Sequence, residues 1–149
     1  MKNTYFLIRV LIIFLLLISG GFAAKSNYFK EGKILFDKKK FEKSKIFFEK
    51  DIVFNPQSEK SYLYLAKIFN ENSNDREQEI NLTNVLLLNP QNDEAIYMLT
   101  LLKIKQSNYD EAKELINKFT LVCKSFCSKK DEIQKKFKKL APDNAKDNN

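Results

Sequence analysis

The chain has 149 residues, of which 44% are hydrophobic and 30% charged, and its formal net charge is +7. This balance is typical of one globular domain with a highly charged surface. The sequence contains no histidine, which removes the commonest general base and a common metal ligand. It also has no glycine-rich phosphate loop, nucleophile elbow or metal-binding carboxylate motif, so we expect no enzyme and no cofactor.

Residues 1–23 are predicted to be an export signal. A basic start and an apolar run over residues 10–18 are followed by small residues, the arrangement found in secretory signals. Small side chains at Gly21 and Ala23 place the expected cleavage after Ala23, with Ala24 as the second choice. The chain is therefore expected to be exported, to the periplasm or cell envelope of a bacterium.

An uncleaved membrane anchor is the alternative, because residues 5–22 are about long enough to cross a bilayer core of roughly 30 Å. Removing residues 1–23 takes away Lys2 and Arg9 and no acid, so the net charge falls from +7 to +5. Much of that charge lies in the segment 128–149, which we interpret as a solvated basic helix face. Nucleic acid is an unlikely partner for such an exported chain.

The rest of the chain is predicted to be all-α. Beyond the signal the only glycine is Gly32, and the only prolines are Pro56, Pro90 and Pro142. So few helix breakers over about 125 residues favour helices throughout. Large residues also recur at three- and four-residue steps, with a break at residues 37–40 that separates two short helices.

Two stretches nearly repeat each other: FNPQSEKSYLYL at 54–65 and LNPQNDEAIYML at 88–99. The interval between them also links further positions, namely Tyr28, Tyr62 and Ile96; Gly32, Ala66 and Thr100; Phe48, Leu82 and Ile116; and Pro56 and Pro90. This pattern resembles the tetratricopeptide repeat, whose period is 34. The resemblance implies an α-solenoid of three helix pairs, with units at about 25–58, 59–92 and 93–126, and a capping helix at 128–140. The polar residues that follow predict a disordered tail at 141–149.

The resemblance also makes local predictions. Small side chains are expected where paired helices approach most closely. These positions hold Gly32, Ala66, Thr100, Ser44, Gln78 and Ala112, of which Gln78 is large for its position. The prolines should end the preceding helices near Asn55 and Asn89, and Ser58 or Asn92 should cap the next helices. Lys103, Asp75, Gln78 and Glu31 depart from the family pattern, and the loop at 71–75 is expected to be looser than a tight turn.

The capping helix is expected to begin at Ser128, with Asp131 three residues later as in a capping box. Ile133, Phe137 and Leu140 should form its apolar stripe, beneath a face rich in lysine. Such a helix would cover the apolar end that a repeat array otherwise exposes.

Cys123 and Cys127 are the one reactive pair. In an intact helix, residues four apart have Cβ atoms about 6 Å from each other, too far for a disulfide. A disulfide therefore requires the chain to turn between them, which the expected unit boundary allows. The sequence leaves open a structural disulfide or two free thiols, and a redox or metal site is the less favoured reading.

In the family that the chain resembles, the first helix of each unit lines a concave groove. Carried over by position, the groove residues are Phe29, Lys33, Phe36, Leu63, Lys67, Asn70, Tyr97, Leu101 and Ile104. This surface suits a protein or peptide segment with apolar anchors and an acidic group. We therefore expect a non-catalytic adaptor or scaffold. The alternatives are a self-associating or membrane-surface structural protein and, third, a thiol-redox protein.

Overall fold

The structure is a computed structural model that describes residues 27–142. The expected export signal at 1–23, its cleavage position and residues 143–149 of the expected tail lie outside the described residues. Within residues 27–142, no helix has both the length and the apolar character needed to cross a membrane.

The described chain is helical, and no strand occurs between residues 27 and 142. Its elements are α2 (Tyr28–Asp37), α3 (Phe41–Phe54), α4 (Glu59–Glu71), α5 (Asp75–Leu88), α6 (Asp93–Lys105), α7 (Tyr109–Val122), a 3₁₀ turn (Cys127–Lys129) and α8 (Lys130–Leu140). The all-α prediction is confirmed. Helices α3 and α5 end at Phe54 and Leu88, just before Pro56 and Pro90, as expected. The next helices, α4 and α6, begin directly after Ser58 and Asn92.

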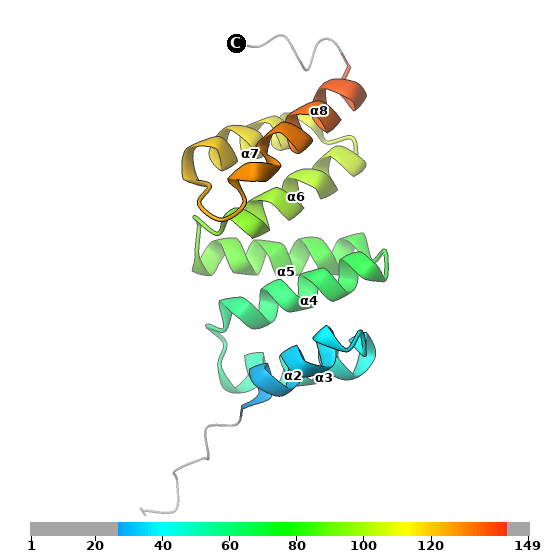
Figure 1. Cartoon of the computed structure of the whole chain (residues 1–149), viewed down its shortest axis with the longest axis vertical. Coiled ribbons are helices and arrows are strands. Elements are labelled where there is room, and N and C mark those ends of the chain that lie inside the picture. The colour runs from blue at the N-terminus through cyan, green and yellow to red at the C-terminus, as the bar shows by residue number, and fades with distance from the viewer. Residues whose placement is uncertain (1–26, 143–149) are drawn as a thin grey trace, which may run out of the picture.

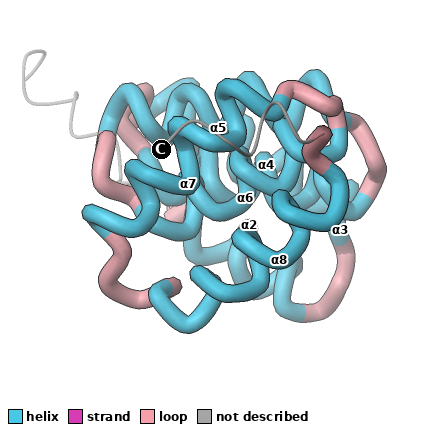
Figure 2. Tube along the Cα trace, turned by 90° about the horizontal axis from the view of Figure 1, so that it is seen from above, coloured by secondary structure: helices cyan, strands magenta, loops and turns pink. Residues whose placement is uncertain are grey.

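Neighbouring helices pack against one another along the chain. The closest pairs are α2 with α3, α4 with α5, and α6 with α7, and α3 also contacts α4 while α5 contacts α6. The last helix, α8, packs on both α6 and α7. Figure 1 shows the helices following one another along the long axis, from α2 and α3 at one end to α8 at the other. Viewed down that axis, the loops gather on two opposite sides of the molecule (Figure 2).

The helix boundaries repeat at the interval that separates the two similar stretches at 54–65 and 88–99. Helix α6 begins and ends one such interval after α4, and α3, α5 and α7 are spaced in the same way. The turns repeat as well: Lys39, Ser73 and Ser107 have positive φ angles of 55°, 53° and 59°. The same three backbone hydrogen bonds close each turn. The loop at 71–75 was expected to be looser than the others, but it has the same geometry and that prediction is wrong.

The side chains expected at close approaches are buried. Ala66, Thr100 and Ala112 are fully enclosed, and Ser44 donates a hydrogen bond of 2.7 Å to the carbonyl oxygen of Gly32. A Cβ atom added to Gly32 would lie 2.7 Å from the ring of Phe48. Helices α2 and α3 therefore approach as closely as they do because residue 32 has no side chain.

Two residues that depart from the family pattern form ion pairs. Lys103 is 6% exposed, and its Nζ lies 2.7 Å from Glu79 and 2.8 Å from Glu111. Burial alone lowers the pKa of Lys103, but hydrogen bonds to Glu111 and Glu79 outweigh it and raise the pKa. Asp75 is 2.6 Å from Lys105. Lys103 and Asp75 thus each have a partner of opposite charge on a neighbouring helix.

Candidate protein-binding groove

A hollow of about 740 Å³ lies where α4, α5, α6 and α8 meet. Its lining combines apolar side chains, two amides and three lysines: Met98, Leu101, Leu102, Ile104, Tyr97, Leu140, Asn70, Gln78, Lys105, Lys136 and Lys139. The volume is in the range of sites that hold a small ligand or an anchoring side chain. In Figure 1, α4, α6 and α8 lie toward the viewer, with α5 and α7 behind them.

The charges at this hollow are predominantly positive. Lys105 is paired with Asp75, and Lys136 lies 3.6 Å from Glu132. Among the described residues, Lys139 forms no ion pair, and it is exposed at the end of α8 beside Leu140. An occupant with an apolar anchor and an acidic group would therefore meet both apolar surface and an available ammonium group.

In the third helix pair, the expected groove residues divide between surface and core. Leu101 is half-buried and lines the hollow, whereas Ile104 is 4% exposed and belongs largely to the core. The Tyr97 hydroxyl donates a hydrogen bond of 2.8 Å to Glu132, and its ring packs near Phe119 and Phe126. Tyr97 therefore holds α8 on α6 as well as lining the hollow.

The pKa values of Tyr97 and Glu132 are shifted in opposite directions, and both shifts favour the hydrogen bond between them. Burial, followed by the hydrogen bond to Glu132, raises the pKa of Tyr97 to about 12. The hydrogen bond from Lys129, followed by that from Tyr97, lowers the pKa of Glu132 to about 2. At neutral pH the phenol is therefore neutral and the carboxylate charged, which is the state that makes this hydrogen bond.

Of the three groove residues expected in the second helix pair, only Asn70 lines the hollow. Leu63 is 8% exposed and packs in the core, so its side chain is not available to a partner. Lys67 forms an ion pair of 2.7 Å with Glu94 and lies 4.8 Å from the ring centroid of Tyr64. Its charge thus links α4 to α6.

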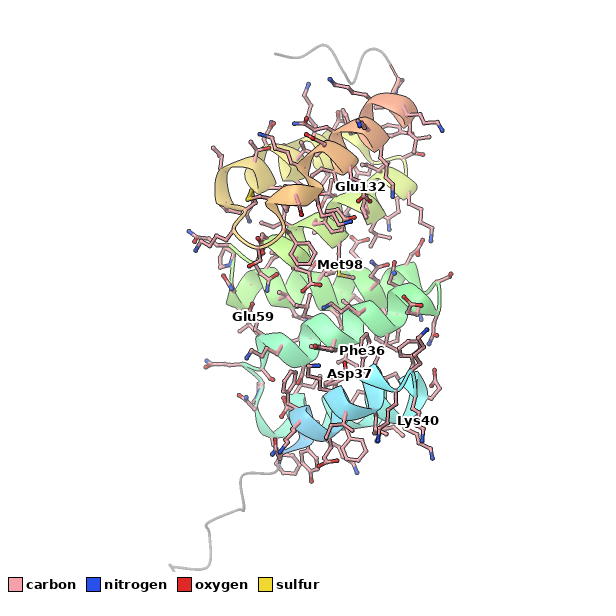
Figure 3. The ribbon with its side chains drawn as sticks, viewed as in Figure 1. Phe36, Asp37, Lys40, Glu59, Met98 and Glu132 are labelled. Carbon is pink, nitrogen blue, oxygen red and sulfur yellow. A yellow bond between two sulfur atoms is a disulfide. The ribbon has the colours of Figure 1, made fainter. Side chains whose placement is uncertain are left out.

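The first helix pair lies away from the hollow. The rings of Phe29 and Phe36 pack against Tyr64, with centroid distances of 5.6 and 4.9 Å. Lys33 is exposed and pairs with Asp37 at 2.7 Å. In Figure 3, Phe36 lies near α2 and Met98 lies farther along the molecule, toward Glu132. Of the nine expected residues, the hollow therefore takes in four, namely Asn70, Tyr97, Leu101 and Ile104.

The sequence interpretation missed the contribution of α8. Lys136, Lys139 and Leu140 come from the helix that was expected only to cover the array, yet they line the hollow. The repeat pattern could have predicted this contribution. The helix after the third unit takes the place of the first helix of a fourth unit, and first helices line the groove. Leu140 was expected in the apolar stripe with Ile133 and Phe137, but it is 52% exposed. That part of the stripe prediction is wrong because α8 ends there.

Acidic side chains stabilise the loops that connect successive helix pairs, which we call the joints. Glu59 and Asp93 occupy the same place in successive pairs, each at the first position of a helix. Glu59 accepts hydrogen bonds from the side chains of Asn89 and Asn92, at 3.0 and 2.5 Å. Glu59, at the start of α4, thus stabilises the joint between α5 and α6. Asn92 also caps α6, because its side-chain oxygen accepts a hydrogen bond of 2.8 Å from the backbone N–H of Ala95 in the first turn.

Asp93 holds the last joint through the backbone. One carboxylate oxygen accepts hydrogen bonds from the N–H groups of Lys124, Ser125 and Phe126, at 2.7, 2.6 and 2.9 Å. Burial alone raises the pKa of Asp93, but the hydrogen bonds from Phe126, Lys124 and Ser125 outweigh it and keep the pKa below its ordinary value. The charged form of Asp93 is therefore the form that fits this loop.

The two cysteines close the same loop. Cys123 and Cys127 form a disulfide, with their Cα atoms 5.2 Å apart. The geometry is reached because α7 ends at Val122 and the backbone of Cys123 is extended. Ser128 was expected to begin the next helix, but α8 begins at Lys130 after a 3₁₀ turn and has no side-chain cap. That prediction is wrong because the short disulfide loop, held by Asp93, delays the helix start.

Ser58 also differs from its expected role. It occupies the cap position of α4, but its side chain accepts no capping hydrogen bond from the backbone. Its hydroxyl donates instead to the buried carboxylate of Asp51, as does the hydroxyl of Ser61. The need to pair a buried carboxylate thus outweighs the cap.

Neither a comparison with protein-family models nor a search of curated proteins found a match for this chain. Within residues 27–142, no cluster of three or more Cys, Asp or Glu side chains is arranged to hold a metal ion.

Proposed function

We propose that this protein is a non-catalytic adaptor that binds a peptide or protein segment in the hollow between α4, α6 and α8. The observation that carries the proposal is the lining of that hollow, in which apolar side chains lie beside lysines. An extended or helical segment placed there would bury an apolar side chain against Met98 and Leu101. An acidic group of the same segment would then lie beside Lys139.

The architecture that we propose is a tetratricopeptide-type α-solenoid of three helix pairs with α8 as the capping helix. Three observations support it: the constant interval between helix boundaries, the turns with positive φ at the same interval, and the buried small side chains. In a stack of this kind the first helices of the pairs share one face. The hollow lies on α4, α6 and α8, which occupy that position in the proposed stack.

The proposed location is the bacterial cell envelope. It rests on the sequence of residues 1–23, with a basic start, an apolar run and small residues before the expected cut. The disulfide between Cys123 and Cys127 supports it, because disulfides persist in oxidising compartments outside the cytoplasm.

The test is photo-crosslinking in the cell that makes the protein. A photoreactive phenylalanine analogue replaces Leu140 in one variant and Ile46 in the other. Both side chains are about half exposed, but Ile46 lies on α3, away from the hollow. The proposal predicts that residue 140 crosslinks to a different protein and that residue 46 does not. Crosslinks to a second copy would favour self-association, and no crosslink from residue 140 would contradict the proposal.

A further inference from the structure

Three helices end in exposed apolar side chains at a regular interval. Val53, Leu87 and Leu121 occupy the same position near the ends of α3, α5 and α7, and they are 73%, 74% and 85% exposed. Their neighbours Phe54 and Leu88 are also exposed, at 69% and 39%. An isolated exposed leucine needs no explanation, but the same exposed position on three successive helices forms a row.

The row lies along one edge of the molecule. The ends of α3, α5 and α7 lead into the joints that begin α4, α6 and α8, and these joints share the left edge in Figure 1. We call this surface, made of residues 50–60, 84–94 and 118–127, the joint edge. The turns after α2, α4 and α6 lie at the opposite edge in the same view. The exposed apolar row therefore belongs to the joint edge.

The charges of the joint edge suit an anionic surface. Lys50, Lys60 and Lys124 are exposed there. The acids of the same edge are engaged within the molecule. Asp51 and Asp93 are buried, and Glu59, which is half-buried, is hydrogen-bonded to the next joint. Glu94 is also half-buried and forms an ion pair with Lys67. Apolar side chains among lysines are the composition by which surface-bound helices attach to anionic lipid.

The chain also enters the described structure at the joint edge. The ring of Tyr28, the first residue of α2, stacks on that of Phe54 with centroids 5.6 Å apart. The apolar segment 5–22 of the sequence ends five residues before Asn27, a span of at most about 18 Å even in a fully extended chain. Any bilayer that holds this segment would lie close to the exposed row.

We propose that the joint edge lies against the surface of an anionic lipid bilayer, with Val53, Phe54, Leu87 and Leu121 reaching into the headgroup region. The lysines of the same edge contact lipid phosphates. The row forms a line of anchors because each helix pair contributes one. This orientation leaves the hollow between α4, α6 and α8 on a different surface, so lipid contact and partner binding are compatible.

The experiment uses the absence of tryptophan from the chain, which makes one introduced tryptophan an unambiguous reporter. Three full-length variants, Leu87→Trp, Leu121→Trp and Lys38→Trp, are reconstituted on vesicles of phosphatidylglycerol and phosphatidylethanolamine. Lys38 is exposed in the turn after α2, at the opposite edge. Fluorescence is compared with ordinary lipids and with lipids brominated near the headgroup, which quench only tryptophans at that depth.

The proposal predicts that brominated lipid lowers the fluorescence of Leu87→Trp and Leu121→Trp about twofold or more, since an interfacial apolar face reaches about 5–10 Å into the headgroup and acyl boundary, the depth of the bromine atoms. Lys38→Trp should remain unquenched. Unquenched fluorescence at all three positions would overturn the proposal. A blue shift at residues 87 and 121 without quenching would also overturn it, because a second copy or another protein would then cover the row. Equal quenching at all three positions would exclude a lipid contact specific to this edge.

Discussion

The carboxylate of Asp93 should contribute strongly to the stability of the last joint. It accepts three backbone hydrogen bonds from residues 124–126, and each net hydrogen bond to a charged group contributes about 1.5–3 kcal/mol. Water can reach part of this loop and the disulfide restrains it, so the full sum is not expected. We expect Asp93→Ala to lower the free energy of unfolding by about 2–4 kcal/mol and Asp93→Asn by about 1–2 kcal/mol, since the amide keeps one neutral acceptor.

The assay is urea unfolding of the full chain, with the disulfide intact, followed by far-UV circular dichroism. Glu114→Gln serves as the control, because Glu114 is exposed in the middle of α7 and its change should be within about 0.5 kcal/mol. The reasoning would be refuted if Asp93→Ala unfolded within that margin of the wild type. The disulfide alone would then fix the loop.

The pH dependence gives this prediction a second readout. The pKa of Asp93 is lowered in the folded protein, so its contribution to stability is fully present above the unfolded pKa of about 3.9. It is lost as pH falls from there through the lower folded pKa. The stability difference between wild type and Asp93→Asn should therefore shrink as the solution is acidified below about pH 4. A difference that stayed constant in that range would contradict the assignment.

Three further predictions concern the helix pairs. Ser73→Gly should raise the free energy of unfolding by about 0.5–1 kcal/mol, because φ at residue 73 is positive; Asn72→Gly, where φ is negative, should not raise it, and equal effects in thermal unfolding would contradict the reasoning. Gly32→Ala should destabilise by about 1–3 kcal/mol because the new Cβ would meet Phe48, so a stabilised variant in the urea assay would argue against this close approach. Lys103→Met should lower the free energy of unfolding by about 1–2 kcal/mol, because it removes the ion pair with Glu79. The double variant Lys103→Met with Glu79→Gln should lose less stability than the sum of the two single variants. Strict additivity in this double-mutant cycle would show that the pair is not coupled.

Much of the fold was predictable because its signals are local. Pro56 and Pro90 mark where helices stop, and the interval between them relates positions whose side chains are buried in the same way. The three turns were harder to predict. Lys39, Ser73 and Ser107 adopt positive φ without being glycine, so the middle turn was wrongly expected to be loose. The backbone hydrogen bonds that close these turns leave no mark in side-chain identity.

The binding surface was less predictable because burial depends on neighbouring helices. Position alone placed Leu63 on the groove, but the packing of α4 with the following helices encloses it. Lys103 conflicts with an apolar position in the sequence pattern, and only the structure brings Glu79 and Glu111 to it. The contributions of Lys139 and Leu140 depend on how α8 packs against α6, which the spacing of residues along one helix does not determine.

The most direct test of the proposed adaptor function is the affinity of the segment that crosslinks to residue 140. Its binding should be measured with a groove variant, Lys139→Glu with Leu140→Ser, and with a control variant, Lys43→Glu with Ile46→Ser. Both variants change one exposed lysine and one exposed aliphatic side chain, so their net charges are equal. We predict that the groove variant weakens binding about tenfold or more, a loss of about 1.4 kcal/mol, and that the control does not. Equal affinity for the two variants would contradict binding in the hollow between α4, α6 and α8.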